Sequence, residues 1–190
     1  MESIIKDSIT TFLQQNQITS HSQHGFTKGR SRLTNLLESL EQWTQALDNG
    51  YGVDILYLDY RKAFDSVPHQ RLIHKLSTLG CQGKLLLWVE SFLHNRTMRV
   101  GVRGSYTSWF DMLSGVPQGS VFGPNLFLLY VNELPSWIQS SINMFADDTK
   151  VWRVIATDLD YTALQMDIDV LLKWSDQWLL RFNSIHRSVK

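Results

Sequence analysis

The spacing of apolar residues along the chain predicts several helices with short strands between them. Apolar side chains recur three and four positions apart in five segments, as they do on the buried side of an amphipathic helix. A sixth, shorter apolar segment, which begins with proline, is expected to form a buried helix. The expected helices cover roughly residues 2–17, 31–49, 68–80, 83–93, 124–131 and 158–179.

Residues at the ends of these segments support the expected helix boundaries. Ser31 is a candidate N-cap, and Asn49-Gly50 is a typical helix stop. Pro68 suits the first turn of a helix, and Gly80 is expected to end that helix. On the helix at 31–49 we expect the buried side to consist of Leu33, Leu36, Leu37, Leu40 and Trp43. On the last helix we expect a solvated acidic side, which consists of Asp160, Asp167, Asp169 and Asp176.

Three regions have the composition of β-structure. The segment from Val53 to Asp59 is apolar on both faces, which is typical of a central strand. Residues 142–152 are expected to form two short strands joined by a tight turn. A second hairpin is expected at residues 97–110, with its turn at Arg103-Gly104-Ser105.

The turn of the first hairpin, Ala146-Asp147-Asp148, is chemically unusual. A two-residue hairpin loop favours Asn-Gly or Asp-Gly, because it requires positive φ. This turn instead places two like charges side by side, and a bound cation explains that cost better than the turn itself does. An Asp-Asp pair alone is more commonly a solvated surface turn, so a cation site also needs a third carboxylate.

Asp59 is the candidate for this third carboxylate. It ends the expected central strand and lies 88 residues before Asp147, so only the fold can bring the two together. Strands that converge in one sheet would do so. Considered alone, Asp59 is equally well explained as a strand-end or capping residue.

Two basic segments have the chemistry of a polyanion-binding surface. One is a glycine-bracketed turn, and the other is the expected second hairpin, where arginines alternate with aromatic residues. Both suit contact with a phosphate backbone. A solvated loop and an exposed edge strand carry such charges as well. The residues concerned are Lys28, Arg30 and Arg32 in the turn and Arg96, Arg99 and Arg103 in the hairpin.

The loop at residues 114–120 contains Gly115 and Gly119 on either side of Val-Pro-Gln. Two glycines allow the backbone of another molecule to come close. The loop leads into the expected buried helix, and a helix N-terminus can hold a phosphate or a base edge. Without other information, an ordinary connection is the simpler explanation.

Composition narrows the class of protein. The chain has 190 residues, 43% of them hydrophobic, which is typical of one or two globular units. The formal net charge is zero, so no global field favours nucleic acid. The charge is uneven, however. Residues 61–103 carry eight Lys or Arg against two acidic residues, whereas residues 154–180 carry five Asp against one Lys. We expect a basic surface for a polyanion and an acidic surface for solvent.

Cysteine content and apolar stretches bear on the compartment. The single cysteine, Cys81, excludes a disulfide framework and favours a reducing environment. The N-terminus shows no signal-peptide pattern, and the longest apolar stretch, residues 121–131, is short and interrupted. We therefore expect an intracellular protein, cytoplasmic or nuclear, with no membrane partner.

Three motifs follow one another along the chain: residues 58–65 (Leu-Asp-Tyr-Arg-Lys-Ala-Phe-Asp), 115–120 (Gly-Val-Pro-Gln-Gly-Ser) and 145–148 (Phe-Ala-Asp-Asp). Together they closely resemble the reverse transcriptase domain of non-LTR (LINE-type) retrotransposons, and the resemblance covers nearly all of the chain. No motif is specific alone, but the ordered combination is highly specific. Further matches lie at residues 23–31 and 91–96.

The resemblance implies an α+β fold. This is the right-hand polymerase fold with fingers and palm, in which an antiparallel palm sheet packs on helices. It implies partial fingers at residues 1–52, the first palm segment at 53–67, helices and a hairpin returning to the fingers at 68–113, and the rest of the palm at 114–190. The thumb, the upstream fingers and the endonuclease are then expected elsewhere in a mobile-element polyprotein, of which this chain is a fragment truncated at both ends.

The resemblance also implies a two-metal catalytic site. Asp59, Asp147 and Asp148 would be both the catalytic and the metal-binding residues, and the carbonyl of Tyr60 would complete the site. The expected cofactor is two Mg²⁺ ions, with Mn²⁺ as a possible substitute. Magnesium takes oxygen ligands and keeps phosphate oxygens in its shell, which agrees with this set of residues.

Substrate contacts are implied as well. Phe64 matches the sugar gate of the family, a ring beneath the deoxyribose that leaves no room for a 2′-hydroxyl. Gln118 and Gly119 match the loop that positions the template and the incoming nucleotide. The implied partners are an RNA template, a DNA primer and dNTPs.

Three positions depart from the family pattern. Thr27 stands where arginine is usual, Phe122 where leucine is usual, and His186 where a lysine would protonate pyrophosphate. The leading hypothesis is an RNA-directed DNA polymerase. One alternative is a non-catalytic remnant that binds RNA or protein. Another is a different Mg²⁺-dependent palm enzyme such as a nucleotide cyclase, which Phe64 and the loop at 115–119 disfavour.

Overall fold

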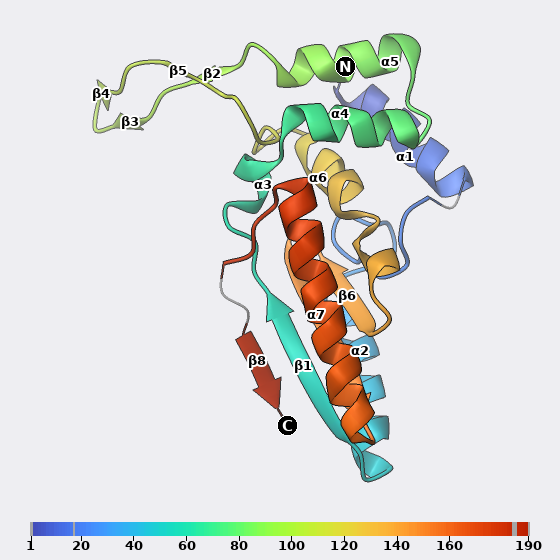
Figure 1. Cartoon of the computed structure of the whole chain (residues 1–190). Coiled ribbons are helices and arrows are strands. Elements are labelled where there is room, and N and C mark those ends of the chain that lie inside the picture. Colours follow the sequence, from blue (N-terminus) through green and yellow to red (C-terminus); the bar gives the residue numbers. More distant parts are fainter. Residues whose placement is uncertain (1, 17, 184–185, 190) are drawn as a thin grey trace.

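The chain folds around a four-stranded sheet (Figure 1). The computed structural model describes residues 2–16, 18–183 and 186–189, without the side chains of Gln14 and residues 186–189. The strands lie in the order β6-β7-β1-β8, and each neighbouring pair is antiparallel, which confirms the expected antiparallel sheet. Their bounds are β1 (Gly52–Leu58), β6 (Ser141–Phe145), β7 (Asp148–Ile155) and β8 (His186–Val189).

All six expected helices form, close to the expected bounds. They are α1 (Glu2–Gln15), α2 (Arg32–Asp48), α4 (His69–Thr78), α5 (Gly83–Leu93), α6 (Gly123–Val131) and α7 (Asp158–Trp178). A short helix after β1, a 3₁₀ turn before β6 and the edge strand β8 were not predicted. The first two are α3 (Ala63–Ser66) and η1 (Leu134–Trp137).

Helices cover both faces of the sheet, α7 on one side and α2 on the other (Figure 1). Alternate residues of β1 point to opposite faces. Leu56 and Leu58 therefore join the large core shared with α7, whereas Val53 and Ile55 join a small core with Ala46 of α2. This two-sided burial is the physical reason for the apolar run in β1, and the prediction of a central strand is confirmed.

The leucine-rich side of α2 is not buried, and the prediction for this face was wrong. Leu33 is 62% exposed and Leu37 is 55% exposed, while the side that faces the sheet is small and polar. Lys150 on β7 donates hydrogen bonds to the carbonyl of Asn35 (3.0 Å) and to the hydroxyl of Ser39 (2.6 Å). These contacts set the rotation of α2. The exposed leucines are Leu33, Leu36, Leu37 and Leu40, and Trp43 is half-buried.

The predicted N-cap of α2 is confirmed. The Ser31 hydroxyl accepts a hydrogen bond from the Thr34 backbone amide, and the Thr34 hydroxyl accepts one from the Ser31 amide, which forms a complete capping box. Two amides that the helix itself leaves unpaired are satisfied in this way.

Two aspartates of α7 correct the prediction of a uniformly solvated acidic side. Asp169 and Asp176 are exposed, as expected, but Asp160 is half-buried in an ion pair with Arg153 (3.2 Å) and Asp167 is buried. The carboxylate of Asp167 accepts hydrogen bonds from the backbone amides of Gln139 (3.1 Å) and Ser140 (2.8 Å). Asp167 therefore ties α7 to the segment that enters β6.

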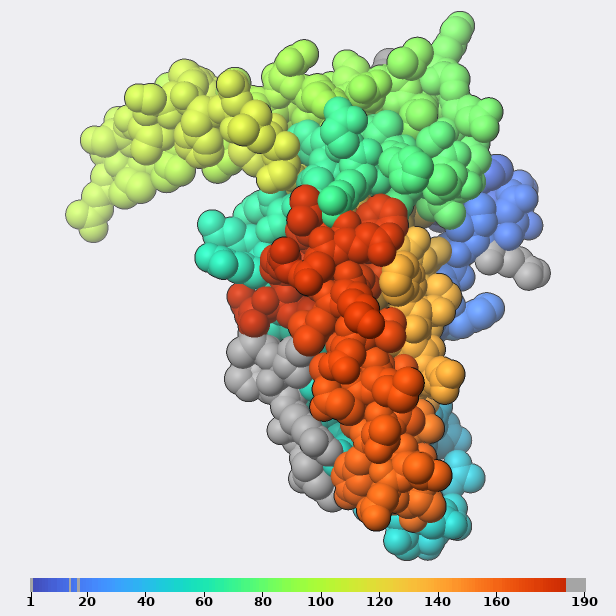
Figure 2. Space-filling model, viewed as in Figure 1, coloured from blue at the N-terminus to red at the C-terminus, as the bar shows by residue number. Residues whose placement is uncertain are grey.

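The second predicted hairpin forms an arm that extends away from the body, as both views of the molecule show (Figures 1 and 2). It consists of two short antiparallel ladders, one after the other along the arm: β2 pairs with β5, and β3 pairs with β4 nearer the tip. The tip turns at Arg103 and Gly104, which have φ of 49° and 84°. The ladders consist of β2 (Thr97–Met98), β3 (Gly101–Val102), β4 (Ser105–Tyr106) and β5 (Phe110–Asp111). Across the described part of the chain, no helix combines the length and the apolar character needed to cross a membrane.

Candidate active site

The β6–β7 hairpin carries the two adjacent aspartates at its bend. Phe145 pairs with Asp148, so Ala146 and Asp147 form a two-residue turn. The positive φ that such a turn needs is adopted by Ala146, at 57°. This left-handed conformation costs a non-glycine residue about 1–2 kcal/mol. The turn is therefore as unfavourable as the sequence predicted, and neighbouring residues must hold it.

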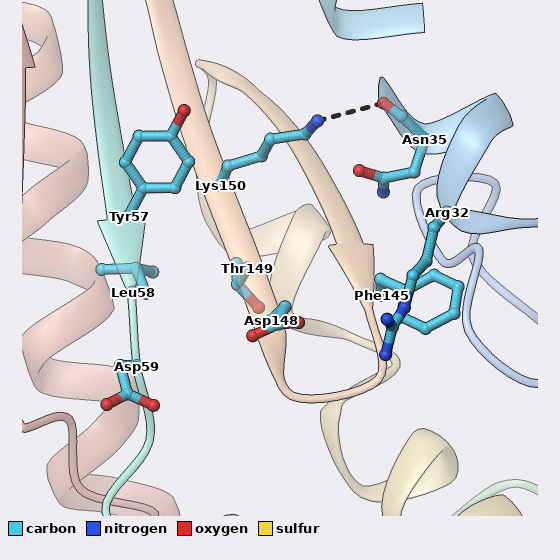
Figure 3. A pocket seen from close by; sticks show the side chains of 9 residues that line it. All are labelled: Arg32, Asn35, Tyr57, Leu58, Asp59, Phe145, Asp148, Thr149 and Lys150. Carbon is cyan, nitrogen blue, oxygen red and sulfur yellow. Dashed lines mark hydrogen bonds between the residues drawn. The ribbon is translucent and has the colours of Figure 1, made fainter. Parts of the chain in front are cut away.

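Strand pairing brings the end of β1 to the start of β7. Leu58 lies opposite Thr149, so Asp59 follows β1 next to the position where Asp148 begins β7. Asp59 and Asp148 line one cavity of about 370 Å³. Figure 3 shows the two aspartates on neighbouring strands, with Arg32 lying against the ring of Phe145 across the cavity. The structure thus confirms that the fold joins residues almost ninety positions apart.

Asp147 is close enough to the other two aspartates to be affected by their charge. Burial is the largest influence on its carboxyl, and it raises the pKa of Asp147 above the usual value. The negative charges of Asp148 and Asp59 raise this pKa further. Like charges that converge in this way favour a bound cation, because a cation removes their mutual repulsion.

The carboxylates suit a divalent cation in charge and in donor type, but they are not arranged as a finished metal site. Among the residues that the structure describes, no group of three or more His, Cys, Asp or Glu side chains is placed to hold a metal ion. One oxygen of Asp59 already accepts a hydrogen bond from the side-chain amide of Asn183 (2.8 Å).

Tyr60 and Phe64 play different parts after β1. The side chain of Tyr60 is buried between Phe182, Phe127 and α7, and burial raises the pKa of its hydroxyl. Only the backbone of Tyr60 is therefore available to the site, and the expected carbonyl contact stays a prediction. Phe64 is half-buried, and its ring stacks on Phe127 with 4.5 Å between the ring centroids.

The loop at residues 114–119 packs against α3, the short helix that carries Phe64. The backbone amide of Val116 donates to the carbonyl of Phe64 (2.8 Å), and Gln118 donates through Nε2 to Oδ1 of Asp65 (2.8 Å). Gly115 has a φ of 91°, and a Cβ at this position would lie 2.8 Å from the backbone of Asp65. Gln118 and Gly119 are exposed beside α3. Sequence reasoning assigned no role to Asp65, which orients Gln118.

The basic turn that contains Lys28, Arg30 and Arg32 lies beside the cavity of the aspartates. Arg32 lines the aspartate cavity and also lines a neighbouring cavity of about 670 Å³ together with Lys28 and Arg30. The guanidinium of Arg30 hydrogen-bonds to the carbonyl of His21 and to Nε2 of His24, so part of its role is structural.

The arginines of the arm lie elsewhere. The guanidinium of Arg99 lies 4.2 Å from the ring centroid of Tyr106 and 4.6 Å from that of Trp109. Arg96 lies over Phe92 at the base of the arm, and Arg103 is at its tip. Figure 1 places the arm well away from the β6–β7 hairpin, so the structure does not bring these arginines to the aspartates.

The order of the motifs and the convergence of the aspartates agree with a comparison of this chain with models of known protein families. Residues 1–185 match the family model described as reverse transcriptase (RNA-dependent DNA polymerase). This chain belongs to the reverse transcriptase family. The resemblance to the enzymes of non-LTR mobile elements is confirmed by its relatives.

Two relatives of this reverse transcriptase chain are polymerases of mobile elements. The chain is 32% identical over 186 residues to the RNA-directed DNA polymerase from mobile element jockey of Drosophila melanogaster, an alignment that covers 93% of this chain and 19% of that protein. It is 28% identical over 193 residues to the jockey polymerase of Drosophila funebris, with coverage of 95% and 20%. The chain thus spans about a fifth of the length of these curated relatives.

Solved telomerase structures share the fold of this reverse transcriptase chain. Telomerase from Candida albicans, solved in complex with a TWJ fragment of telomeric RNA, superposes with a TM-score of 0.66 at 13% identity and covers 100% of this chain and 35% of its own. Apo telomerase from Candida tropicalis gives a TM-score of 0.66 at 10% identity, with coverage of 99% and 40%. These similarities support a polymerase-type arrangement of helices and sheet.

Proposed function

We propose that this reverse transcriptase domain adds deoxynucleotides to a primer 3′ end on an RNA template, by phosphoryl transfer at two divalent metal ions. The observation that supports this most directly is the convergence of Asp59, Asp147 and Asp148 at one end of the sheet, where two of them line a common cavity. In the same proposal, residues 53–67 and 114–190 form the palm, and residues 1–52 and 68–113 contribute to the fingers.

The three aspartates would hold Mg²⁺, or Mn²⁺ in its place, together with the backbone carbonyl of Tyr60. When bound, such ions stabilise the negative charge of the primer hydroxyl and of the leaving pyrophosphate. The protein itself supplies the cavity that Asp59 and Asp148 line and the strand pairing that sets the spacing of these two residues. His186, which matches the lysine position of the family, lies on β8 with its side chain outside the described residues, and we assign it no step.

The residues around α3 would select and place the nucleotide. The Phe64 ring, fixed against Phe127, would exclude a 2′-hydroxyl by shape. Gln118, fixed by its hydrogen bond to Asp65, and the neighbouring Gly119 would contact the nucleotide and the template base. The rigid contact between the loop and α3 supports their assignment to one substrate surface.

Basic residues would follow the nucleic-acid backbone on two surfaces. Lys28, Arg30 and Arg32 lie beside the aspartate cavity and would contact phosphates near the reaction. The arm carries Arg96, Arg99 and Arg103 next to aromatic rings, an arrangement that suits single-stranded RNA at a distance from the chemistry.

A second candidate is a non-catalytic module that binds RNA or protein. The observation that favours it is the arm, where Arg99 lies against the rings of Tyr106 and Trp109 away from the aspartates, because such a surface can bind RNA without chemistry at the aspartates. Primer extension separates the two candidates.

The test is extension of a DNA primer on an RNA template with dNTPs and Mg²⁺, comparing the wild-type chain with Asp147→Asn. Loss of a metal ligand should reduce the rate by on the order of 100-fold or more, since metal ions supply several kcal/mol of charge stabilisation. Absence of product from both proteins would support the non-catalytic candidate. Equal product from both would refute the assignment of Asp147 or reveal a contaminating polymerase.

A further inference from the structure

The segment at residues 22–25 runs beside β6 and reaches the aspartate turn. The backbone amide of His24 donates to the carbonyl of Met144 (2.8 Å), and the amide of Met144 donates to the carbonyl of Ser22 (2.8 Å). Gln23 and Met144 thus form a parallel bridge between segments more than a hundred residues apart in sequence. This pairing extends the sheet beyond β6 and carries the side chain of Gln23 to the hairpin bend.

The side chain of Gln23 binds the residue of the turn that has the unfavourable backbone conformation. Its Oε1 accepts hydrogen bonds from the backbone amides of Ala146 (2.9 Å) and Gly25 (2.8 Å). Gln23 is only 2% exposed, and Ala146 is also buried. Without this oxygen, the Ala146 amide would be a buried donor with no acceptor, which strongly disfavours a structure.

Gly25 shows how tightly the segment and the turn are packed. A Cβ at this position would lie 2.3 Å from the backbone nitrogen of Ala146, which is closer than two non-bonded atoms can approach. Glycine therefore allows the backbone of the segment to lie directly against the turn. Asn35 of α2 adds a further contact, because its side-chain amide donates to the carbonyl of Met144 (3.1 Å).

We propose that Gln23 is a positioning residue, which holds the Ala146–Asp147 turn and thereby places the carboxylates of Asp147 and Asp148 for metal binding. The inference rests on the proposed function for its metal-binding part. Its structural part, that the Gln23 oxygen holds the turn, is independent of that function.

The first experiment measures hydrogen exchange of the Ala146 amide by NMR. Amides at the tip of a hairpin normally exchange rapidly. In the wild-type chain we expect Ala146 to exchange as slowly as the amides of β6. In Gln23→Met, which keeps the length of the side chain but removes the acceptor, we expect exchange at least about tenfold faster.

The second experiment measures Mn²⁺ affinity by EPR, which does not depend on polymerase activity. We expect Gln23→Met to weaken binding about tenfold, as is common when a residue that orients metal ligands is lost. The matched control is Gln42→Met on α2, which also removes a glutamine acceptor but away from the turn, where Gln42 accepts from the indole N–H of Trp152 in the middle of β7 (3.3 Å). The control should change neither measurement.

The outcomes separate this inference from the proposed function. Fast exchange of Ala146 in the wild type, or unchanged exchange and Mn²⁺ affinity in Gln23→Met, would overturn the role of Gln23. If the wild-type chain binds Mn²⁺ no better than Asp147→Asn does, the metal site fails, and with it the metal-binding part of the role of Gln23. The exchange measurement still decides whether Gln23 holds the turn. The exchange rate of Ala146 in the wild-type chain can be measured without any variant. It therefore tests the inference even if Gln23→Met fails to fold.

Discussion

Single residues of the candidate site are placed at a cost to stability. The carboxyl of Asp147 is partly buried, and burial together with the charges of Asp148 and Asp59 raises its pKa. A raised pKa in the folded chain means that folding opposes ionisation of this group, so its negative charge disfavours the folded state at neutral pH. A residue selected for stability alone would not be an aspartate here, whereas the carboxylate of an aspartate suits a ligand of a divalent cation.

The replacement Asp147→Asn should therefore stabilise the metal-free chain at pH 7, even though it removes a candidate metal ligand. The gain should shrink as the pH falls through the raised pKa, because the wild-type carboxyl then becomes neutral as well. Thermal denaturation between pH 4 and pH 8 without divalent ions measures the effect. Asp169→Asn, on the exposed side of α7, is the matched control, and a lower Tm for Asp147→Asn at pH 7 would contradict the argument.

At the scale of elements, α2 shows that a polar contact can outweigh an apolar stripe. Burying the leucine side of α2 would leave Lys150 of β7 without acceptors beneath the helix. The observed rotation instead gives Lys150 the Asn35 carbonyl and the Ser39 hydroxyl, and it allows small residues to lie against the sheet. An unpaired buried ammonium costs more than several exposed leucines do, which explains the choice.

The rotation of α2 can be tested by alanine substitutions on its exposed side and in the small core beneath it. Leu33→Ala on the exposed side should change the free energy of unfolding by no more than about 0.5 kcal/mol. Ile55→Ala, in the small core between β1 and α2, should cost about 2–5 kcal/mol. Urea denaturation of the isolated chain measures both, and a large loss for Leu33→Ala would show that this side of α2 is buried.

At the scale of the whole molecule, Lys75 lies where α4, α6 and α7 meet. Its ammonium donates to the carbonyl of Tyr130, forms an ion pair with Glu133 (3.0 Å) and lies 3.7 Å from the ring centroid of Trp178. Burial lowers the pKa of Lys75 to about 8, although Glu133 acts in the opposite direction. The junction of the three helices is therefore sensitive to pH.

The sign of this pH dependence follows from proton binding. Above pH 8 the folded chain has released the Lys75 proton, whereas the unfolded chain keeps it until about pH 10.5. Relative to Lys75→Met, the wild-type chain should therefore gain about 2 kcal/mol of stability between pH 8 and pH 10. Urea denaturation across this range measures the gain, with Lys173→Met as the control on the exposed side of α7. Parallel pH profiles for wild type and Lys75→Met would exclude the linkage.

Much of the fold follows from local patterns. The apolar run of β1, the spacing of the helices, the capping box at Ser31 and the strained turn at residues 146–147 are all local, and each was predicted. The candidate aspartates could also be named, because their positions at strand ends and their order along the chain are properties of the sequence.

The sequence by itself therefore determined most of the elements of this protein and the chemical identity of its candidate site. Only the tertiary structure decided which side of α2 is buried, that Asp167 binds backbone amides, that Asp65 orients Gln118 and that Gln23 supports the turn at Ala146. Each of these depends on a polar partner distant in sequence. Hydrophobic periodicity predicts which side of one element is apolar. It does not predict which donor or acceptor on another element will lie against that element in the folded chain.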